Sequence, residues 1–400
     1  MTFNILEIFF WAAIFVIFYA YAGYGVVLYL MVKAKKLFQR NTWLHKIDAG
    51  HEPEVTFVVP SYNEADIIEE KVENCLSFNY PKEKLKVVFI TDGSTDETPE
   101  LVKKYEDKGV KLLHENKRGG KSAAENRAMK YVDTPIVIFS DANTILPADA
   151  VKNIVRHYAD PKVGAVSGEK RILSKDKDNA SGAGEGIYWK YESALKKLDS
   201  DLNTIVGAAG ELFSFRKELF TELEEDTVLD DFMLSMRIAS KGYKVVYDPE
   251  AYAMETASAS VKEELKRKIR ICAGGWQSMS RLTSALNPMK DAMLSFQYIS
   301  HRVLRWSVVP LLLFLIFPIN IYLFVASNEL LYQVLFYGQC TFYIMAMMGW
   351  YLKNREISSK LLFVPFYFFI MNYAVFMGFF RFISKKQAAA WERAQRSPVT

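Results

Sequence analysis

The sequence predicts a cytoplasmic α/β domain flanked by membrane-spanning helices. Over residues 53–170, short apolar segments alternate with polar helical segments, which is the pattern of a mostly parallel sheet with crossover helices. The mean hydropathy is close to zero, yet charged residues are absent from four stretches: 8–32, 306–328, 331–352 and 361–380. At 1.5 Å of rise per residue, each stretch can cross a hydrocarbon core of about 30 Å as a helix.

The first charge-free stretch is predicted to remain as an N-terminal transmembrane anchor, residues 1–32. It has no basic leader before it and no small-residue cleavage site, so it differs from a signal peptide. The basic residues that follow it, with no acid among them, are Lys33, Lys35, Lys36, Arg40 and Lys46. Such charges stay on the inner side of a membrane. We therefore expect an integral protein of a plasma membrane, such as a bacterial inner membrane, with its α/β domain in the cytoplasm.

The α/β domain is expected to contain strands at 55–60, 86–91, 110–114, 136–140 and 163–167. Polar helical segments such as 65–77 lie between them and suit right-handed crossovers. In open sheets of this kind, ligands bind beyond the carboxyl ends of the strands. Three of these ends carry polar residues, at 61–64, 92–94 and 141–143.

The rest of the domain, 171–282, has a less regular pattern. It predicts a helix at 185–198, strands at 203–206 and 212–216, and a helix after Leu229. Two amphipathic, basic segments, 261–273 and 289–303, are expected to lie in the membrane interface. The predicted division is a domain at 50–282, an interfacial helix region at 283–305, C-terminal membrane segments at 306–383 and a basic tail at 384–400.

Composition excludes several classes of protein. The net charge of +4 is spread through mixed-sign segments, with no basic stripe interleaved with aromatics, so no nucleic-acid partner is expected. Cys75, Cys272 and Cys340 are too scattered for a disulfide framework, and the sequence lacks an HExxH motif for zinc. The lipid bilayer is the expected partner, and the sequence leaves the oligomeric state open.

Three segments carry residues suited to a nucleotide. Residues 60–64 read Pro-Ser-Tyr-Asn-Glu and offer a turn, an aromatic ring and a carboxylate. Asp92, at the next strand end, can accept hydrogen bonds from a base or a ribose. Residues 116–121 combine three cations with two glycines at a helix start, where free N–H groups favour phosphate. Helix capping after Asp92 and a solvated charge run at 116–121 are the alternatives.

Two acidic motifs predict a metal site and a general base. Asp141 and Asn143 follow a buried strand, and a hard divalent cation prefers oxygen ligands shared with substrate phosphates. A neutral amide binds a metal less strongly than a carboxylate does, and loop capping by Asp141 is the alternative. Asp230 and Asp231 open a helix, where the dipole favours acids and where one acid could be a general base. The sequence does not separate these two roles.

The last motif joins cations to an aromatic residue. Residues 267–270 read Arg-Lys-Ile-Arg and precede a Gly-Gly pair and Trp276. The Gly pair is flexible, and the indole ring could stack on a ring of a ligand. Contact with lipid headgroups is an equally good interpretation of this basic interfacial segment.

Taken in order, the motifs PSYNE, DGS, KRGGK, DAN, LDD and RKIR resemble those of the membrane-bound family 2 glycosyltransferases. That group includes cellulose, chitin-oligosaccharide, poly-N-acetylglucosamine and hyaluronan synthases. The resemblance covers about residues 50–290 and the flanking membrane segments. It implies a GT-A fold, a UDP-sugar donor, and a single displacement by an acceptor hydroxyl that inverts the anomeric centre.

The resemblance also implies a role for each motif. The residues implied to bind the nucleotide sugar are Pro60, Tyr62, Glu64, Asp92, Lys121, Asp141, Arg267 and Arg270, with Asp92 reading the uracil. Those implied to hold Mg²⁺ or Mn²⁺ are Asp141 and Asn143. Asp231 corresponds to the base that takes the acceptor proton, and the acceptor side comprises Gly210, Glu211, Asp230 and Trp276.

Three motifs depart from the family pattern. DAN replaces DxD, LDD replaces Thr-Glu-Asp, and RKIRI replaces QxxRW, with Arg267 in place of the glutamine and Ile271 in place of the tryptophan. The first change bears on metal affinity and the last on processive synthesis. Trp276, a little further along, is a candidate for the missing aromatic surface.

Three functions and one question of topology remain open at this stage. The chain could extend a polysaccharide, add one sugar to a lipid-linked acceptor, or be an inactive membrane scaffold. Three full crossings after the domain would leave the basic tail outside, although its charges favour the cytoplasm. Either the tail is exported or one stretch does not cross, and 361–380, with Pro365 and Asn372 inside it, is the candidate for a re-entrant segment.

Overall fold

A computed structural model describes residues 5–38, 47–173, 180–256, 261–327, 329–352 and 360–385. Two groups of basic residues that bear on the predicted orientation lie outside these ranges. They are Arg40 and Lys46 after the first helix, and the tail beyond residue 385.

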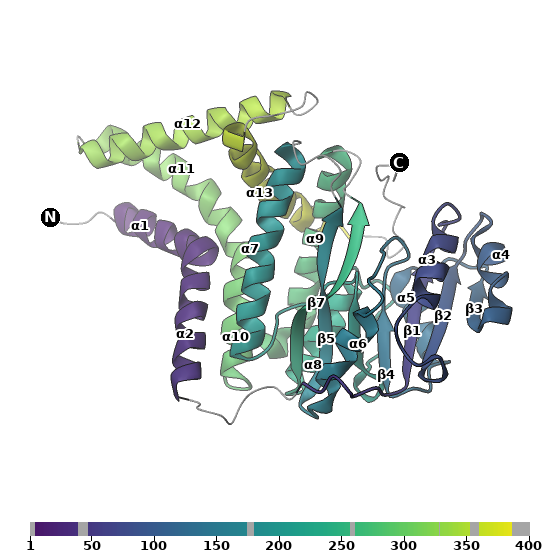
Figure 1. Ribbon diagram of the computed structural model, residues 1–400. Coiled ribbons are helices and arrows are strands. Elements are labelled where there is room, and N and C mark those ends of the chain that lie inside the picture. The colour runs from purple at the N-terminus through teal and green to yellow at the C-terminus, as the bar shows by residue number, and fades with distance from the viewer. Residues whose placement is uncertain are drawn as a thin grey trace.

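The centre of the protein is a seven-stranded, mostly parallel sheet in the order β3-β2-β1-β4-β6-β5-β7 (Figure 1). All neighbouring strands are parallel except β6, which is antiparallel to both β4 and β5. The predicted α/β fold is therefore confirmed. The strands are β1 (Val55–Ser61), β2 (Leu85–Asp92), β3 (Val110–Glu115), β4 (Ile136–Phe139), β5 (Val163–Leu173), β6 (Phe213–Arg216) and β7 (Lys244–Thr256).

In the less regular part of the domain, residues 171–282, the apolar pattern of the sequence led to two errors in the prediction of strands. The strand predicted at 203–206 is wrong, because this segment forms a turn that follows a helix and shares only isolated hydrogen bonds with Val245. Strand β7 was not predicted, since Asp248, Pro249 and Glu250 interrupt its apolar pattern. The interruption coincides with a register shift after Gly168 in the partner β5, and such irregularities are where a sheet tolerates proline.

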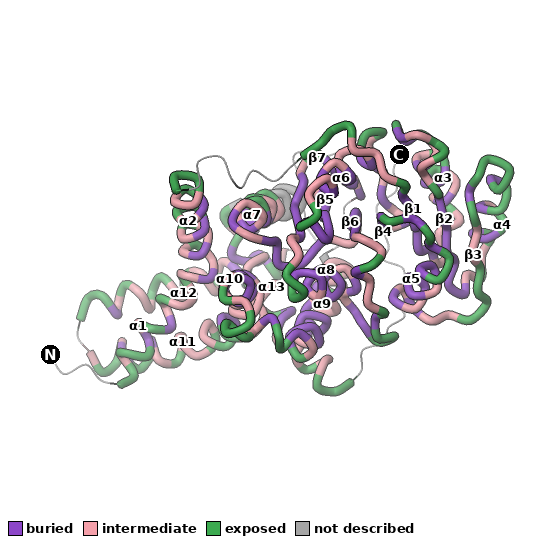
Figure 2. The backbone as a smooth tube through the Cα atoms, turned by 90° about the horizontal axis from the view of Figure 1, so that it is seen from below, coloured by how far each residue is buried: buried purple, intermediate pink, exposed green. Residues whose placement is uncertain are grey.

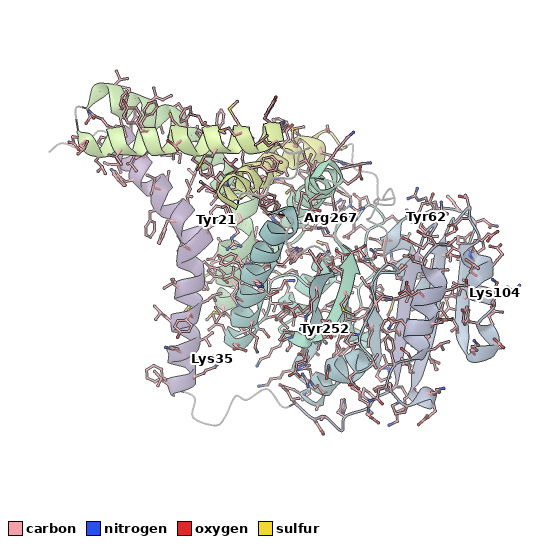
Figure 3. All side chains as sticks on the ribbon, turned by 45° about the horizontal axis from the view of Figure 1, so that its top comes forward. Tyr21, Lys35, Tyr62, Lys104, Tyr252 and Arg267 are labelled. Carbon is pink, nitrogen blue, oxygen red and sulfur yellow. The ribbon has the colours of Figure 1, made fainter. Side chains whose placement is uncertain are left out.

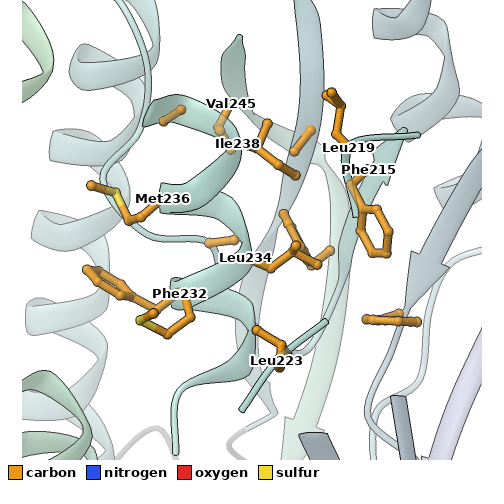
Figure 4. Close-up of a cluster of buried hydrophobic side chains, with 14 of the residues drawn as sticks. Phe215, Leu219, Leu223, Phe232, Leu234, Met236, Ile238 and Val245 are labelled. Atoms are coloured by element: carbon orange, nitrogen blue, oxygen red, sulfur yellow. The ribbon is translucent and has the colours of Figure 1, made fainter. Parts of the chain in front are cut away.

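Alternation along the strands creates one apolar core on each face of the sheet. On one face, Val58 and Val88 join a cluster built largely from α8 (Asp230–Ser240) (Figure 4). On the other face, Phe57 and Phe89 pack with α3 (Ile68–Leu76) and α6 (Ala150–Val155). Side chains two residues apart share a face of a strand, so this two-sided burial follows directly from the continuous apolar runs.

Within the described ranges, four helical segments are long and apolar enough to cross a membrane: Ile5–Phe38, Ala292–Ala326, Leu330–Leu352 and Leu361–Ile383. They extend away from the sheet on one side of the molecule (Figure 1), and their surfaces alternate between exposed and intermediate residues (Figure 2). The helices involved are α1 (Ile5–Phe18), α2 (Tyr24–Phe38), α10 (Ala292–Tyr298), α11 (Val309–Ala326), α12 (Leu330–Leu352) and α13 (Lys360–Ile383).

Two of these segments contain a π-helical stretch, and the two stretches lie against each other. One runs Tyr19–Gly23 between α1 and α2, and the other runs Ile299–Val308 between α10 and α11. The Tyr19 hydroxyl lies 2.8 Å from that of Ser300, and Arg305 donates to the Ala20 carbonyl at 2.9 Å. Helix runs on without a break from Ala292 into the membrane segment, so the separate interfacial region at 283–305 stays a prediction. Helix α13 is likewise unbroken at Pro365, and the side reached by the C-terminus also stays a prediction.

Helix α7 (Ala180–Leu202) joins the sheet to the membrane helices, since it contacts both β7 and α2. Its Asp199 is fully buried and accepts hydrogen bonds from the Tyr24 hydroxyl at 2.5 Å, from Gln297 at 2.9 Å and from His301 at 2.6 Å. About two helical turns earlier, Glu192 forms an ion pair with Arg302 at 2.6 Å. Buried acids on one helix thus bind three elements that are distant in sequence.

We expect Asp199→Ala to lower the free energy of unfolding by about 3–5 kcal/mol, because three buried donors lose their acceptor at once. The matched control is Asp201→Ala on the same helix, where partly exposed pairs with Lys36 and Lys197 are lost and the cost is below about 1 kcal/mol. Thermal unfolding in detergent measures both. Equal losses of stability in the two variants would contradict this account.

Candidate active site

Lys121 is the centre of a charged cluster at the carboxyl edge of the sheet. It begins α5 (Lys121–Met129), and its ammonium lies 2.8 Å from Asp141 Oδ1, 3.1 Å from Asp230 Oδ2 and 3.9 Å from Glu125 Oε1. Burial alone would lower the pKa of Lys121, but the nearby carboxylates, Asp231 included, raise it well above its usual value. The lysine therefore stays charged and holds acids from three separate segments together.

Asp92 fixes the loop that leads to Lys121. Its buried carboxylate accepts hydrogen bonds from the Gly119 and Gly120 N–H groups, at 3.1 and 2.6 Å, and from Arg127 at 3.0 Å. The neighbouring Gly93 has φ +68°, and a Cβ there would lie 2.8 Å from the Arg118 nitrogen, so only glycine fits this close approach. The structure thus gives Asp92 a loop-positioning role, and its contact with uracil stays a prediction.

The turn after β1 carries an aromatic platform. The Arg118 guanidinium stacks on the Tyr62 ring, 3.7 Å from its centroid, and so joins the PSYNE and KRGGK segments. Asn63 adopts φ 53° and is held there by the Thr95 N–H, which donates to its Oδ1 at 2.8 Å. The Glu64 N–H donates to Thr98 Oγ1 at 2.9 Å, and Pro60 lies inside β1. Figure 3 shows Tyr62 on the sheet side of the molecule.

The two acids at the start of α8 have opposite environments. Burial and the neighbouring Asp230 charge raise the pKa of Asp231 to about 7, with Lys121 acting in the other direction. Burial would raise the pKa of Asp230 as well, but its contact with Lys121 holds that pKa below the usual value. Of the pair, Asp230 is the permanent anion and Asp231 is the group that can gain and lose a proton near neutral pH.

Glu125 lies in the site but was not among the residues predicted from the sequence motifs. It lies one turn after Lys121 on α5, is fully buried, and shares a hydrogen bond with Asp230. Burial and the Asp230 charge raise its pKa well above the usual value, which favours the protonated form of its carboxyl. A spacing of four residues from Lys121 was the only available signal, and that signal is common on helix surfaces.

The predicted acceptor side lies beside the same cluster. A Cβ added to Gly210 would stand 3.2 Å from Lys121 Nζ and 3.3 Å from Asp231 Oδ2, so this glycine leaves space next to the predicted base. Glu211 interacts with a different cation, because its carboxylate accepts a hydrogen bond from the Lys170 ammonium at 2.6 Å. Lys170 also forms an ion pair with Glu255. Burial opposes ionisation of Glu211, but Lys170 lowers its pKa to about 2.

The two arginines on α9 (Val261–Arg281) differ in their partners. Arg267, labelled in Figure 3, forms an ion pair with Glu264 at 3.1 Å. Within the described parts of the chain, the Arg270 side chain forms no hydrogen bond or ion pair, and its Nε is buried without a partner. Burial lowers its pKa, while Asp230 and Asp141 are close enough to oppose that shift. Of the two, Arg270 is the arginine free to meet an anion at the site.

Trp276 lies on the side of α9 that meets α13. Its ring centroid is 4.8 Å from that of Phe379. This contact is with a membrane helix, so stacking of Trp276 on an acceptor sugar stays a prediction.

The predicted metal ligands lie at the edge of the cluster. The Asp141 side chain is 31% exposed and already accepts from Lys121, and Asn143 follows in the same loop. Across the described ranges, no three His, Cys, Asp or Glu side chains gather closely enough to bind a metal unaided. One carboxylate and one amide oxygen do fit a hard cation whose remaining ligands are phosphate oxygens and water.

Comparison with known proteins now decides the family. The sequence model of the family described as Glycosyl transferase family 2 matches residues 56–223. This region runs from β1 to the loop before α8. These residues form a family 2 glycosyltransferase domain. The resemblance predicted from the motifs is confirmed, and Lys121, Asp92 and Asp141 all lie inside the matched region.

The family 2 domain has named relatives. The poly-beta-1,6-N-acetyl-D-glucosamine synthase of Staphylococcus aureus is 28% identical over 235 residues, which cover 57% of this chain and 56% of that protein. The synthase of the same name from Staphylococcus epidermidis is 24% identical over 306 residues, 74% of this chain and 73% of that protein. The chain thus spans little more than half the length of the S. aureus relative that it matches.

A solved structure supports the fold over nearly the whole chain. The mannosyltransferase PcManGT from Pyrobaculum calidifontis, in complex with GDP-Man and Mn2+, superimposes with a TM-score of 0.70 at 24% identity. The match covers 96% of this chain and 100% of that one. At this identity the similarity establishes a shared GT-A architecture with its membrane helices.

We expect Glu125→Gln to leave stability at pH 7 unchanged or slightly raised, because burial and the Asp230 charge already favour the protonated carboxyl in the native protein. In the unfolded chain that carboxyl ionises above about pH 4.3, so the native protein loses stability through this group as the pH rises. Glutamine removes that loss, and the advantage of the variant should grow with pH. Unfolding measured across the pH range tests this, and an advantage that shrinks with rising pH would refute it.

The contrasting variant is Lys121→Met, which leaves several buried carboxylates without their cation. We expect it to cost about 3–5 kcal/mol of stability at neutral pH. Acidification should recover part of that loss as the carboxylates are protonated. A loss that does not depend on pH would mean that Lys121 acts through packing alone.

Proposed function

We propose that the family 2 domain transfers a sugar from a UDP-sugar to an acceptor hydroxyl with inversion, and that Asp231 is the general base. The observation that carries the proposal is the opposed pair at the start of α8. Lys121 keeps Asp230 ionised, and burial beside that charge raises the pKa of Asp231 to about 7. A base with this pKa is matched to proton removal near neutral pH.

In the proposed step, the Asp231 carboxylate removes the proton of the acceptor hydroxyl. The resulting oxygen forms a bond to the anomeric carbon as the bond between that carbon and UDP breaks. UDP leaves with the electron pair of the broken bond, and Asp231 then releases the proton to solvent. Gly210 supports this arrangement, because the missing side chain leaves space beside Asp231 Oδ2 for the hydroxyl.

The leaving diphosphate gains negative charge during the step, and cations on this chain can offset it. Lys121 begins α5, so its ammonium and the start of the helix act in the same place. Arg270 brings a guanidinium that forms no ion pair within the described residues, although Asp230 and Asp141 act on it electrostatically. When bound by Asp141 and Asn143, Mg²⁺ or Mn²⁺ would supply further electrostatic stabilisation of the diphosphate.

The nucleoside would lie against the platform formed by Tyr62 and Arg118, at the end of β1. The stacked pair offers a flat surface to a base, and Asp92 holds the adjoining loop in place. The named relatives are synthases of a poly-N-acetylglucosamine, and the structural neighbour is bound to a nucleotide sugar with Mn2+. These facts support a nucleotide-sugar donor and glycan synthesis at the membrane. The basic residues that follow the first charge-free stretch, from Lys33 to Lys46, support a cytoplasmic position of the domain.

We expect Asp231→Asn to lower kcat by about 10²–10⁴, the contribution of a positioned base, while leaving UDP-sugar binding intact. Release of UDP measures transfer when membranes are supplied with a panel of UDP-sugars, with GDP-mannose added as a comparison. Calorimetry with UDP measures binding. Product formation by the purified variant at the native rate would show that Asp231 is not the base.

The dependence of kcat/KM on pH should have an acidic limb near pH 7, since Asp231 must be ionised to act. In Asp230→Asn, a neighbouring negative charge disappears, the pKa of Asp231 falls, and the limb moves to lower pH. The matched control is Asp226→Asn, an exposed acid of the same loop that pairs with Arg281. A limb that shifts equally in both variants, or in neither, would contradict the assignment.

Complete chelation of divalent ions should abolish transfer, and added Mg²⁺ or Mn²⁺ should restore it. Asp141→Asn should need a higher metal concentration for the same rate, because one carboxylate ligand is lost. Transfer that continues after complete chelation would contradict the proposed metal site at Asp141 and Asn143, but it would leave the proposal of Asp231 as the general base unaffected.

A further inference from the structure

Helices α9 and α13 meet at a very close crossing. A Cβ added to Gly378 would stand 2.6 Å from Cys272 Cβ and 2.8 Å from the Ala273 nitrogen, so the two backbones approach as closely as glycine allows. Beside this crossing lies an open pocket of about 740 Å³. Its lining consists of Ile269, Met377, Phe380, Arg381, Ile383 and Ser384.

The pocket has a membrane character that follows from helix geometry. Met377, Phe380 and Arg381 lie three and four residues apart and therefore share one face of α13. This helix is one of the segments able to cross a membrane, and the pocket lies at its C-terminal end. Phe380 is 57% exposed and Ile383 54%, so the rim is apolar and open to whatever surrounds the helix. Lipid chains are the solvent that suits such a rim.

One guanidinium, that of Arg381, lines the pocket, and that of Arg270 lies close enough to interact with it electrostatically. Within the described residues, neither Arg381 on α13 nor Arg270 on α9 forms a side-chain hydrogen bond or an ion pair. The two are close enough for the charge of Arg381 to affect the pKa of Arg270, which burial already lowers. Asp141 and Asp230 act on Arg270 as well. Arg270 is therefore electrostatically linked both to the candidate active site and to the pocket.

An anion is the ligand that this arrangement lacks. Guanidinium groups bind phosphate strongly through charge-assisted, often bidentate hydrogen bonds. The apolar rim on a membrane helix distinguishes a phosphate attached to a lipid from one in solution, because only the former brings acyl chains to cover it. Charge and lining together favour an amphiphile.

We propose that the pocket between α9 and α13 binds the phosphate headgroup of an anionic membrane lipid, and that a lipid-linked acceptor reaches the family 2 domain through it. The second part rests on the proposed transfer reaction. A phosphate held at Arg381 leaves the rest of the headgroup free to extend past Arg270 towards Asp231. The acceptor would then enter from the bilayer, and its hydroxyl end would be presented to the base.

The test uses the full chain in nanodiscs of phosphatidylcholine that contain a small share of phosphatidic acid with a diazirine on one acyl chain. After illumination, mass spectrometry should find the label on the peptides that carry Ile269 and Met377–Ser384. Arg381→Gln should lower this labelling about tenfold, the loss that corresponds to one charge-assisted hydrogen bond. The matched control is Lys385→Gln, which removes an exposed charge next to the pocket but outside its lining, and it should label like the native chain.

Three outcomes would overturn the lipid site. They are equal labelling by a diazirine phosphatidylcholine, unchanged labelling in Arg381→Gln, or loss of labelling when inorganic phosphate is added, which would identify a site for soluble phosphate. UDP binding, measured on the same samples, separates this proposal from the reaction. Arg381→Gln should bind UDP like the native chain, whereas a native chain that is labelled but binds no UDP would overturn the transfer reaction and leave the lipid site standing.

Discussion

The candidate active site depends on one ammonium group among several carboxylates. Lys121 contacts Asp141, Asp230 and Glu125, and Asp231 is also near enough to influence it. Acids crowded in this way cannot all be ionised without a cation. The result is a division of states: the pKa of Asp230 is lowered, that of Glu125 is raised, and that of Asp231 is raised to about 7. Lys121 thus contributes to the different pKa values of these carboxyl groups, and the proposed acid–base chemistry at the edge of the sheet depends on that difference.

The scaffold around Lys121 explains why it can be placed so accurately. Asp92 ends β2, and its carboxylate gathers the N–H groups of Gly119 and Gly120 just before α5 begins. The loop is thus tied to the sheet at the residue next to the lysine. Asp92, which the resemblance predicts to read a base, therefore also holds the loop before α5 in shape.

The membrane helices are also connected to the site through hydrogen bonds. Arg302, in the π-helical stretch before α11, pairs with Glu192 on α7 and donates to the Val206 carbonyl at 3.1 Å. Val206 begins the loop that carries Gly207, where φ is +95° and a Cβ would overlap the Phe232 ring, and then Gly210. The predicted acceptor side of the site is thus held partly by a helical segment that is able to cross a membrane.

The sequence by itself determined the elements whose signals are local. Apolar runs identified six strands of the sheet, charge-free stretches identified four helices within the described residues that are able to cross a membrane, and the order of short motifs identified the family. Prediction from the sequence failed for elements whose structure depends on contacts with residues that are distant in the chain. The segment 203–206 has strand composition but little pairing, and β7 is a strand in spite of Pro249, because β5 bends to receive it. Glu125, the loop contacts of Asp92, and the difference between Arg267 and Arg270 appeared only in the tertiary structure. Periodicity records which face of an element is buried, whereas the ionisation of a buried group depends on charges brought to it from elsewhere in the chain.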